Sequence, residues 1–253
     1  MSLTNGIGKI DCRFVVNLTL SFVAITLMHI VHESTAKAAE INPELFSIDD
    51  KPFGVSMGDW LAQYWNWTAS IARTEHPRYD TTGEKCGIDQ NGPIWFLDAP
   101  VEQGSTARTI PCAIPSDKAI FIPLLTGECD YSEIKTDEGV TKCSQEGNNG
   151  GNIRLNIDAQ PLFEIKATSE DDYAKNRVLT DFFNLTLVPD NIWEAPSGTF
   201  KARADGYFAI LKPLPPGEHL VNFDTLVISP MDSSINYHIS VYYKLSIIDN
   251  TSR

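Results

Sequence analysis

The chain has few basic residues and few histidines. Its 253 residues include 20 Lys and Arg, 33 Asp and Glu and 5 His, which gives a net charge of −13. A strongly acidic surface repels nucleic acid and anionic lipid, so we expect neither as a partner. P-loop, dinucleotide-binding glycine and H-E-x-x-H motifs are also missing, which argues against those nucleotide-binding and zinc-enzyme classes.

Long apolar runs are missing except at the start. The run Phe14–Val31 follows Lys9 and Arg13 and precedes Ala36-Lys37-Ala38, a cleavage site of small residues. This order is typical of a secretory signal peptide, which we place at residues 1–38. The run is also near the lower limit for a membrane span, so an uncleaved anchor is the alternative. We expect a secreted or cell-surface protein with no other membrane segment.

Residues 39–253 remain, a length that suits a single domain with a real core. Sequons at Asn66, Asn184 and Asn250 are candidate glycan sites in an exported chain, so a glycoprotein is expected where the host uses them.

Cysteine is scarce, and Cys12 lies in the signal segment. The other four residues make an even count, which in an exported chain indicates two disulfides with three conceivable pairings. We favour Cys86–Cys112 and Cys129–Cys143, the second of which would close a polar loop and contribute up to ~3 kcal/mol. Free buried thiols are the alternative. Zinc is disfavoured because no C-x-x-C and no neighbouring His is present.

Residues 57–73 have the spacing of an amphipathic helix, with Trp60, Tyr64 and Trp67 on one stripe. Ser56 precedes this helix and Asp59 follows three residues later, as in a capping box. The helical aromatic residues are predicted to be core. Trp65, at the margin of the stripe, is the candidate for partial exposure and for stacking on a sugar ring.

The same Ser56 also stands in Gly54-Val55-Ser56-Met57-Gly58, which fits the G-x-S-x-G pentapeptide of serine hydrolases. A nucleophile elbow needs a buried strand before the serine and a parallel α/β sheet around it. Residues 41–54 contain two prolines and two consecutive aspartates, which make a poor buried strand. The sequence therefore favours a helix cap over a nucleophile.

Short apolar runs between turn signals predict strands through the rest of the chain. In residues 235–247 every odd position is apolar or Tyr. If this strand forms a hairpin with residues 219–229, Phe223 opposes Val241 and Val221 opposes Tyr243. Pro123 predicts an edge or a bulge. The pattern indicates a mainly β protein, an antiparallel β-sandwich of jelly-roll or immunoglobulin-like type with one N-terminal amphipathic helix.

The histidines do not form an obvious site. The hairpin register puts His219 and His238 on opposite faces and about 23 Å apart along the strand. We expect His219 to form a hydrogen bond across a strand end, and His76 to lie at the surface. Acidic clusters near residues 49–50, 133–138 and 170–172 are interpreted as solvated loops. Calcium is their alternative ligand, but no motif supports it, and we expect no metal and no cofactor.

Four segments carry a resemblance to a known family, namely residues 58–71, 79–97, 108–124 and 206–247. There the chain is similar to secreted proteins of unassigned function found in soil bacteria and ammonia-oxidising archaea. The helix start of that family resembles G-x-S-x-G-E-W, with an acid where Asp59 stands. The resemblance implies export and the fold rather than an activity.

We therefore expect an exported, non-enzymatic β-sandwich protein that binds a small molecule or glycan at the cell envelope. The alternative is a secreted serine esterase or lactonase with Ser56 as nucleophile and His219 or His238 as base. A third interpretation is a structural envelope protein that self-assembles.

Overall fold

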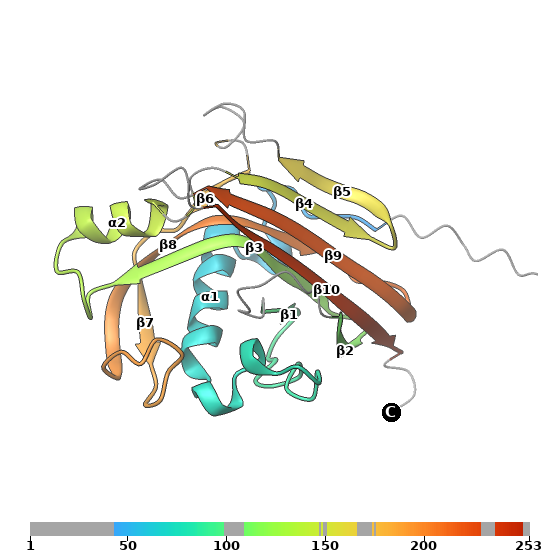
Figure 1. Cartoon of the computed structure of the whole chain (residues 1–253), viewed down its shortest axis with the longest axis horizontal. Coiled ribbons are helices and arrows are strands. Elements are labelled where there is room, and N and C mark those ends of the chain that lie inside the picture. The colour runs from blue at the N-terminus through green and yellow to red at the C-terminus, as the bar shows by residue number, and fades with distance from the viewer. Residues whose placement is uncertain are drawn as a thin grey trace, which may run out of the picture. The chain divides into compact units, whose positions relative to one another are not determined.

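Figure 1 shows the computed structural model of the chain, which describes residues 43–98, 109–146, 148, 151–165, 174, 176–228 and 236–249. The predicted signal segment and Asn250 lie outside these residues, as does the acidic cluster at 170–172. Ile41–Arg253 form one compact unit. Among the described residues no helix has the length and apolarity needed to cross a bilayer.

The described residues are mainly β and form two sheets of mixed orientation. The first sheet has the order β1-β3-β8-β6, with β7 also paired to β8, and its strands are β1 Ile94–Phe96, β3 Ala119–Asp130, β6 Val178–Leu179, β7 Phe183–Leu187 and β8 Gly198–Leu211. The second sheet has the order β2-β10-β9-β4-β5, with strands β2 Thr109–Pro115, β4 Gly151–Ile157, β5 Gln160–Ile165, β9 Gly217–Ile228 and β10 Asn236–Ile248.

The prediction of wholly antiparallel sheets is wrong for two pairs of strands. β1 pairs with β3 in parallel, and β2 pairs with β10 in parallel. The chain leaves β1 in the first sheet, enters the second sheet as β2 and returns as β3. Alternating polarity reports which face of a strand is buried, but it does not report the direction of the neighbouring strand.

The predicted hairpin register between β9 and β10 is confirmed. Phe223 opposes Val241, and Val221 opposes Tyr243. All four side chains are buried, with 3% or less exposed. The turn of this hairpin, residues 229–235, lies outside the described residues.

Pro123 predicted an edge or a bulge, and the structure shows the bulge, because β3 lies between β1 and β8. The register of β3 against β8 shifts between Pro123 and Leu125. The carbonyl of the extra residue, Leu124, accepts a 3.0 Å hydrogen bond from the Thr225 hydroxyl in the other sheet. On β8, Gly206 has φ 145°, and an added Cβ would lie 2.3 Å from the Leu125 carbonyl oxygen, so this close approach requires glycine.

Two hydrophobic clusters organise the layers. One lies between the sheets and joins side chains such as Ile122 of β3 and Tyr207 of β8 to Phe223 of β9 and Leu245 of β10. The other packs helix α1, Met57–Ser70, onto the first sheet, where Tyr64 stacks on Phe121 with ring centroids 4.8 Å apart. Figure 1 shows α1 lying across β3 and β8.

Helix α1 ends three residues earlier than residue 73, because Ile71 adopts an extended conformation with φ −102° and ψ 125°. A second helix, α2 Asp137–Glu146, was not predicted because its sequence is polar and short. The described residues also contain the 3₁₀ turns η1 Pro52–Gly54, η2 Arg73–Glu75 and η3 Pro77–Tyr79.

Both favoured disulfides, Cys86–Cys112 and Cys129–Cys143, are present. The second connects β3 to α2, so the segment that it closes is partly helical rather than a loop. Two disulfides are consistent with an oxidising, extracellular environment.

Candidate functional site

Helix α1 has one capped end and one end that carries a surface cluster. At its start, the Ser56 hydroxyl accepts a 3.1 Å hydrogen bond from the Asp59 amide and donates a 2.6 Å bond to the Asp59 carboxylate. These bonds satisfy a backbone donor that the first helical turn leaves free. Ser56 therefore acts as the N-cap of α1.

At the other end, α1 meets the loop between β7 and β8. This loop is organised by buried Asn191, whose side-chain amide donates to the carbonyls of Val188 and Ala195 at 2.9 and 2.8 Å. Its side-chain oxygen also accepts from the amides of Trp193 and Ala195, at 3.2 Å each. The loop has a fixed shape that presents Trp193 to solvent.

We name the surface formed here the aromatic platform and define it as Arg73, Tyr79, Trp193 and Glu194. Arg73 and Glu194 form a 2.5 Å ion pair, and the Arg73 guanidinium lies 5.1 Å from the centre of the Tyr79 ring. Tyr79 is 43% exposed and Trp193 38% exposed. The platform therefore carries two accessible rings together with an arginine–carboxylate pair that offers hydrogen-bond donors and acceptors.

The platform loop contains unusual backbone angles. Asp190 and Glu194 have φ values of 59° and 56°, in the left-handed region that residues with side chains rarely adopt. Such conformations cost free energy and gather at binding and catalytic sites when the surrounding structure enforces them. Here the hydrogen bonds of Asn191 supply that enforcement.

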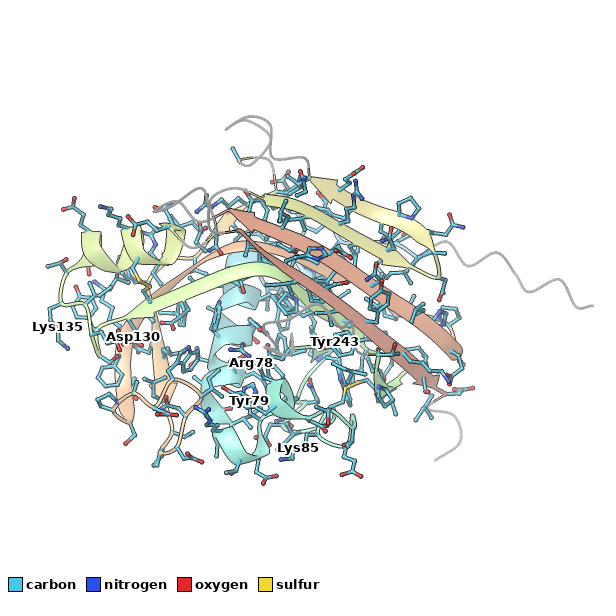
Figure 2. The ribbon with its side chains drawn as sticks, viewed as in Figure 1. Arg78, Tyr79, Lys85, Asp130, Lys135 and Tyr243 are labelled. Atoms are coloured by element: carbon cyan, nitrogen blue, oxygen red, sulfur yellow. A yellow bond between two sulfur atoms is a disulfide. The ribbon has the colours of Figure 1, made fainter. Side chains whose placement is uncertain are left out.

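A buried polar network lies behind the platform. The carboxylate of Asp98, after β1, is fully buried and accepts from Arg78 at 2.9 and 3.1 Å and from the Tyr64 hydroxyl at 2.9 Å. Tyr243 of β10 donates to the Asp98 carbonyl. Burial and the negative charge of Asp98 raise the pKa of Tyr64, so this hydroxyl stays protonated. Figure 2 shows Arg78 and Tyr79 near the end of α1, with Lys85 beyond them.

His76 belongs to this network, so the prediction that it lies at the surface is wrong. It is fully buried, with Nε2 3.2 Å from the Thr68 carbonyl and Nδ1 accepting from the Arg78 amide at 3.1 Å. These partners require hydrogen on Nε2, and burial lowers the pKa of His76 despite nearby Asp98. Both ring nitrogens are engaged, so His76 is not positioned as a base for an outside substrate. The sequence signal that was missed is Pro77, which turns the chain back onto α1.

The three candidate catalytic residues are not brought together. His219 is buried, with Nδ1 2.7 Å from Asp158 and Nε2 3.0 Å from the Pro215 carbonyl. These contacts form the expected hydrogen bond across a strand end. His238 pairs with Asp224 at the opposite end of the β9–β10 hairpin. Ser56 bonds to Asp59, on the helix that packs against the other sheet. The hydrolase alternative stays a prediction without a geometric base beside the serine.

Trp65 is not the exposed aromatic residue that its helical position indicated. Its side chain is 6% exposed, and the exposed ring beside it is Trp193, with centroids 6.1 Å apart. Trp193 stands in residues 188–198, a turn-rich segment where a large aromatic residue has no strand or helix to bury it. That mismatch is the sequence signal that could have identified the platform.

Two sequons fall on described residues. Asn66 is half-buried in α1 and donates to the Ala62 carbonyl at 3.1 Å, whereas Asn184 is exposed on β7. Asn184 is therefore the more accessible acceptor of the two. Glycosylation at either position stays a prediction.

Among the described residues no group of three or more His, Cys, Asp or Glu is placed to hold a metal ion. Glu128 of β3 has a buried side-chain oxygen without a hydrogen-bond partner in the described part of the chain. Burial, followed by the charges of Asp130 and Glu133, raises the pKa of Glu128 to about 8.

Comparison of the chain with known protein families, with curated proteins and with solved structures finds no match.

Proposed function

We propose that this protein is an exported, non-enzymatic β-sandwich protein that binds a glycan at the cell envelope through the aromatic platform. The observation that carries the proposal is the pair of exposed rings on this surface, Tyr79 beside Arg73 and Trp193 next to Glu194 in sequence, together with the Arg73–Glu194 ion pair. Jelly-roll or immunoglobulin-like connectivity and membership of the family of secreted proteins stay proposals as well.

The chemistry of the platform suits a sugar. An aromatic face provides a flat apolar surface for the C–H face of a pyranose ring, while its edge remains in contact with water. A guanidinium and a carboxylate, 43% and 74% exposed, can donate to and accept from neighbouring hydroxyl groups. The loop is held by the hydrogen bonds of Asn191, which supports this function. In a preorganised site, less conformational entropy is lost when a ligand binds.

The surroundings also favour a neutral or weakly charged sugar over an anionic one. Arg73 is neutralised by Glu194, and Lys85 lies 3.7 Å from Glu75. The whole chain carries a net charge of −13, which repels polyanions. We therefore expect neutral hexose or pentose polymers to bind better than sulfated or uronic ones.

The test is a glycan array with the purified exported protein, followed by titration calorimetry of the best ligand. We expect Trp193→Ala and Tyr79→Ala each to weaken binding about tenfold or more, in the range of aromatic hot spots. Phe53→Ala is the matched control, because Phe53 is 51% exposed but precedes α1, ~21 Å of helix away from the platform.

Two outcomes would overturn the proposal. One is the absence of any glycan ligand on the array. The other is equal affinity for the wild type and Trp193→Ala, which would move the binding surface elsewhere. Light scattering in the same samples distinguishes the structural interpretation, since self-assembly would appear as concentration-dependent growth.

A further inference from the structure

A second, apolar site lies at the opposite end of α1 from the platform. A pocket of about 180 Å³ opens between residues 45–48, the edge of β8 and the short strand β6. Met57, the first residue of α1, forms part of its wall. Its lining residues include Phe46, Phe163, Asn176, Val178, Phe208 and Ile210.

The lining is apolar and uncharged. Of its eleven residues only Ser47 and Asn176 have polar side chains, and none of the eleven is ionisable. The rings of Phe46, Phe163 and Phe208 are only partly buried, so the pocket contains apolar surface that the described residues leave uncovered. Covering such surface is favourable at roughly 25 cal/mol per Å². An ion would gain nothing here to offset the loss of its hydration.

One wall of the pocket presents backbone polar groups. β6 pairs with β8 at Gly206, and Phe46 donates its amide to the Ile210 carbonyl at 2.9 Å. Backbone groups of an antiparallel strand alternate between its two edges, so the amide and carbonyl of Phe208 point to this same edge. Phe208 lies between the two covered stretches, where the pocket opens. A ligand in the pocket would therefore contact apolar side chains and could form hydrogen bonds with the backbone of Phe208.

We propose that this pocket binds a small neutral ligand consisting of one aromatic ring with a hydroxyl or amide substituent. The size supports one ring, because an apolar cavity of about 150 Å³ is known to accept benzene. The Asn176 side chain and the Phe208 backbone supply partners for the substituent. The proposal is independent of glycan binding, since the two sites lie at opposite ends of a helix ~21 Å long.

The test uses p-cresol as the probe and the purified exported protein, with affinity measured by titration calorimetry and ligand-observed NMR. We expect saturable binding of p-cresol and about tenfold or more weaker binding of benzoate, which carries a charge. Val178→Phe places a ring in the pocket and should weaken p-cresol binding about tenfold or more. Leu179→Phe is the matched control, because Leu179 is the next residue of β6 and is 36% exposed.

A second variant covers the case in which Val178→Phe fails to fold. Phe163→Ala removes a ring from the lining, which enlarges the pocket and should allow 2-naphthol to bind more tightly than it binds the wild type. The proposal is overturned if wild-type protein shows no saturable p-cresol binding. It is equally overturned if Val178→Phe and Leu179→Phe weaken binding to the same extent, or if folded Phe163→Ala shows no gain for 2-naphthol. Loss of glycan binding in Trp193→Ala leaves all these outcomes unchanged, so the two proposals fail separately.

Discussion

The ring of Trp193 lies against the ring of Trp65, with centroids 6.1 Å apart. The first residue is in a surface loop and the second is in the buried face of α1. Helix α1 therefore packs against the aromatic platform through this contact between Trp65 and Trp193. The indole N–H of Trp65 is buried and has no hydrogen-bond partner in the described part of the chain. Trp65 therefore contributes through the packing of its ring rather than through a hydrogen bond.

This difference between two helical tryptophans gives the first prediction. Trp60 is equally buried, but its indole N–H donates to the Pro52 carbonyl at 3.0 Å. Trp60→Phe should lower the free energy of unfolding by about 1 kcal/mol more than Trp65→Phe, because only Trp60→Phe removes a buried hydrogen bond. Urea denaturation measures both. Equal losses would show that Trp65 has a partner after all.

The second prediction concerns Ser56. Ser56→Ala removes the N-cap of α1 and should lower the free energy of unfolding by about 1 kcal/mol. Ser70→Ala, at the other end of the same helix, is the control and should cost less, because Ser70 only returns a bond to the Trp67 carbonyl within the helix. Thermal denaturation compares them. A fluorophosphonate adduct on Ser56, with unchanged stability in Ser56→Ala, would instead identify a serine hydrolase.

The third prediction concerns the buried ion pair of Asp98 and Arg78. Asp98→Asn removes the negative charge and leaves the guanidinium largely buried without its counter-ion, which should cost about 3–5 kcal/mol. The exposed pair Arg154–Glu164 is the matched comparison, with side chains 60% and 43% exposed. Glu164→Gln should cost less than about 1 kcal/mol. Urea denaturation measures the free energy of unfolding of both variants. A similar decrease in both would show that the buried Asp98–Arg78 pair matters no more for stability than an exposed pair.

Local patterns predicted the local structure well. The alternation in residues 235–247 predicted the β9–β10 register, Pro123 predicted a bulge, and the loop closed by Cys129–Cys143 indicated its disulfide. Each of these features depends on neighbouring residues or on one strand pair. Sequence patterns of this kind report burial and turns within a short window.

Features that depend on the folding of distant segments were missed. The parallel pairing of β1 with β3 depends on how the chain crosses between the two sheets. The burial of His76 depends on Asp98, which lies in another element of the fold. The platform joins Arg73 to Glu194 across 121 residues of sequence. Helix α2 is polar and is held by tertiary contacts and a disulfide, so its propensity alone gave no signal.

The last prediction concerns pH. The pKa of Glu128 is raised to about 8 in the folded protein, from an ordinary value near 4.5, because the carboxyl is buried close to Asp130 and Glu133. Between those two pH values the folded state holds a proton that the unfolded state has released. The free energy of unfolding therefore falls as pH rises from about 4.5 to 8, and this contribution is constant above that range.

Glu128→Gln removes this loss because a neutral amide stays neutral at every pH. The variant should gain about 1–3 kcal/mol over the wild type at pH 8, the usual cost of an unsatisfied buried group, and differ little from it at pH 4. Glu138→Gln is the control, because Glu138 is exposed in the first turn of α2 and should leave the pH dependence unchanged. Asp130→Asn should make the fall in stability end at a lower pH, because removing one of the two repelling charges lowers the pKa of Glu128. Parallel pH profiles for the wild type and Glu128→Gln, measured by urea denaturation, would show that Glu128 is solvated and ionised in the folded protein.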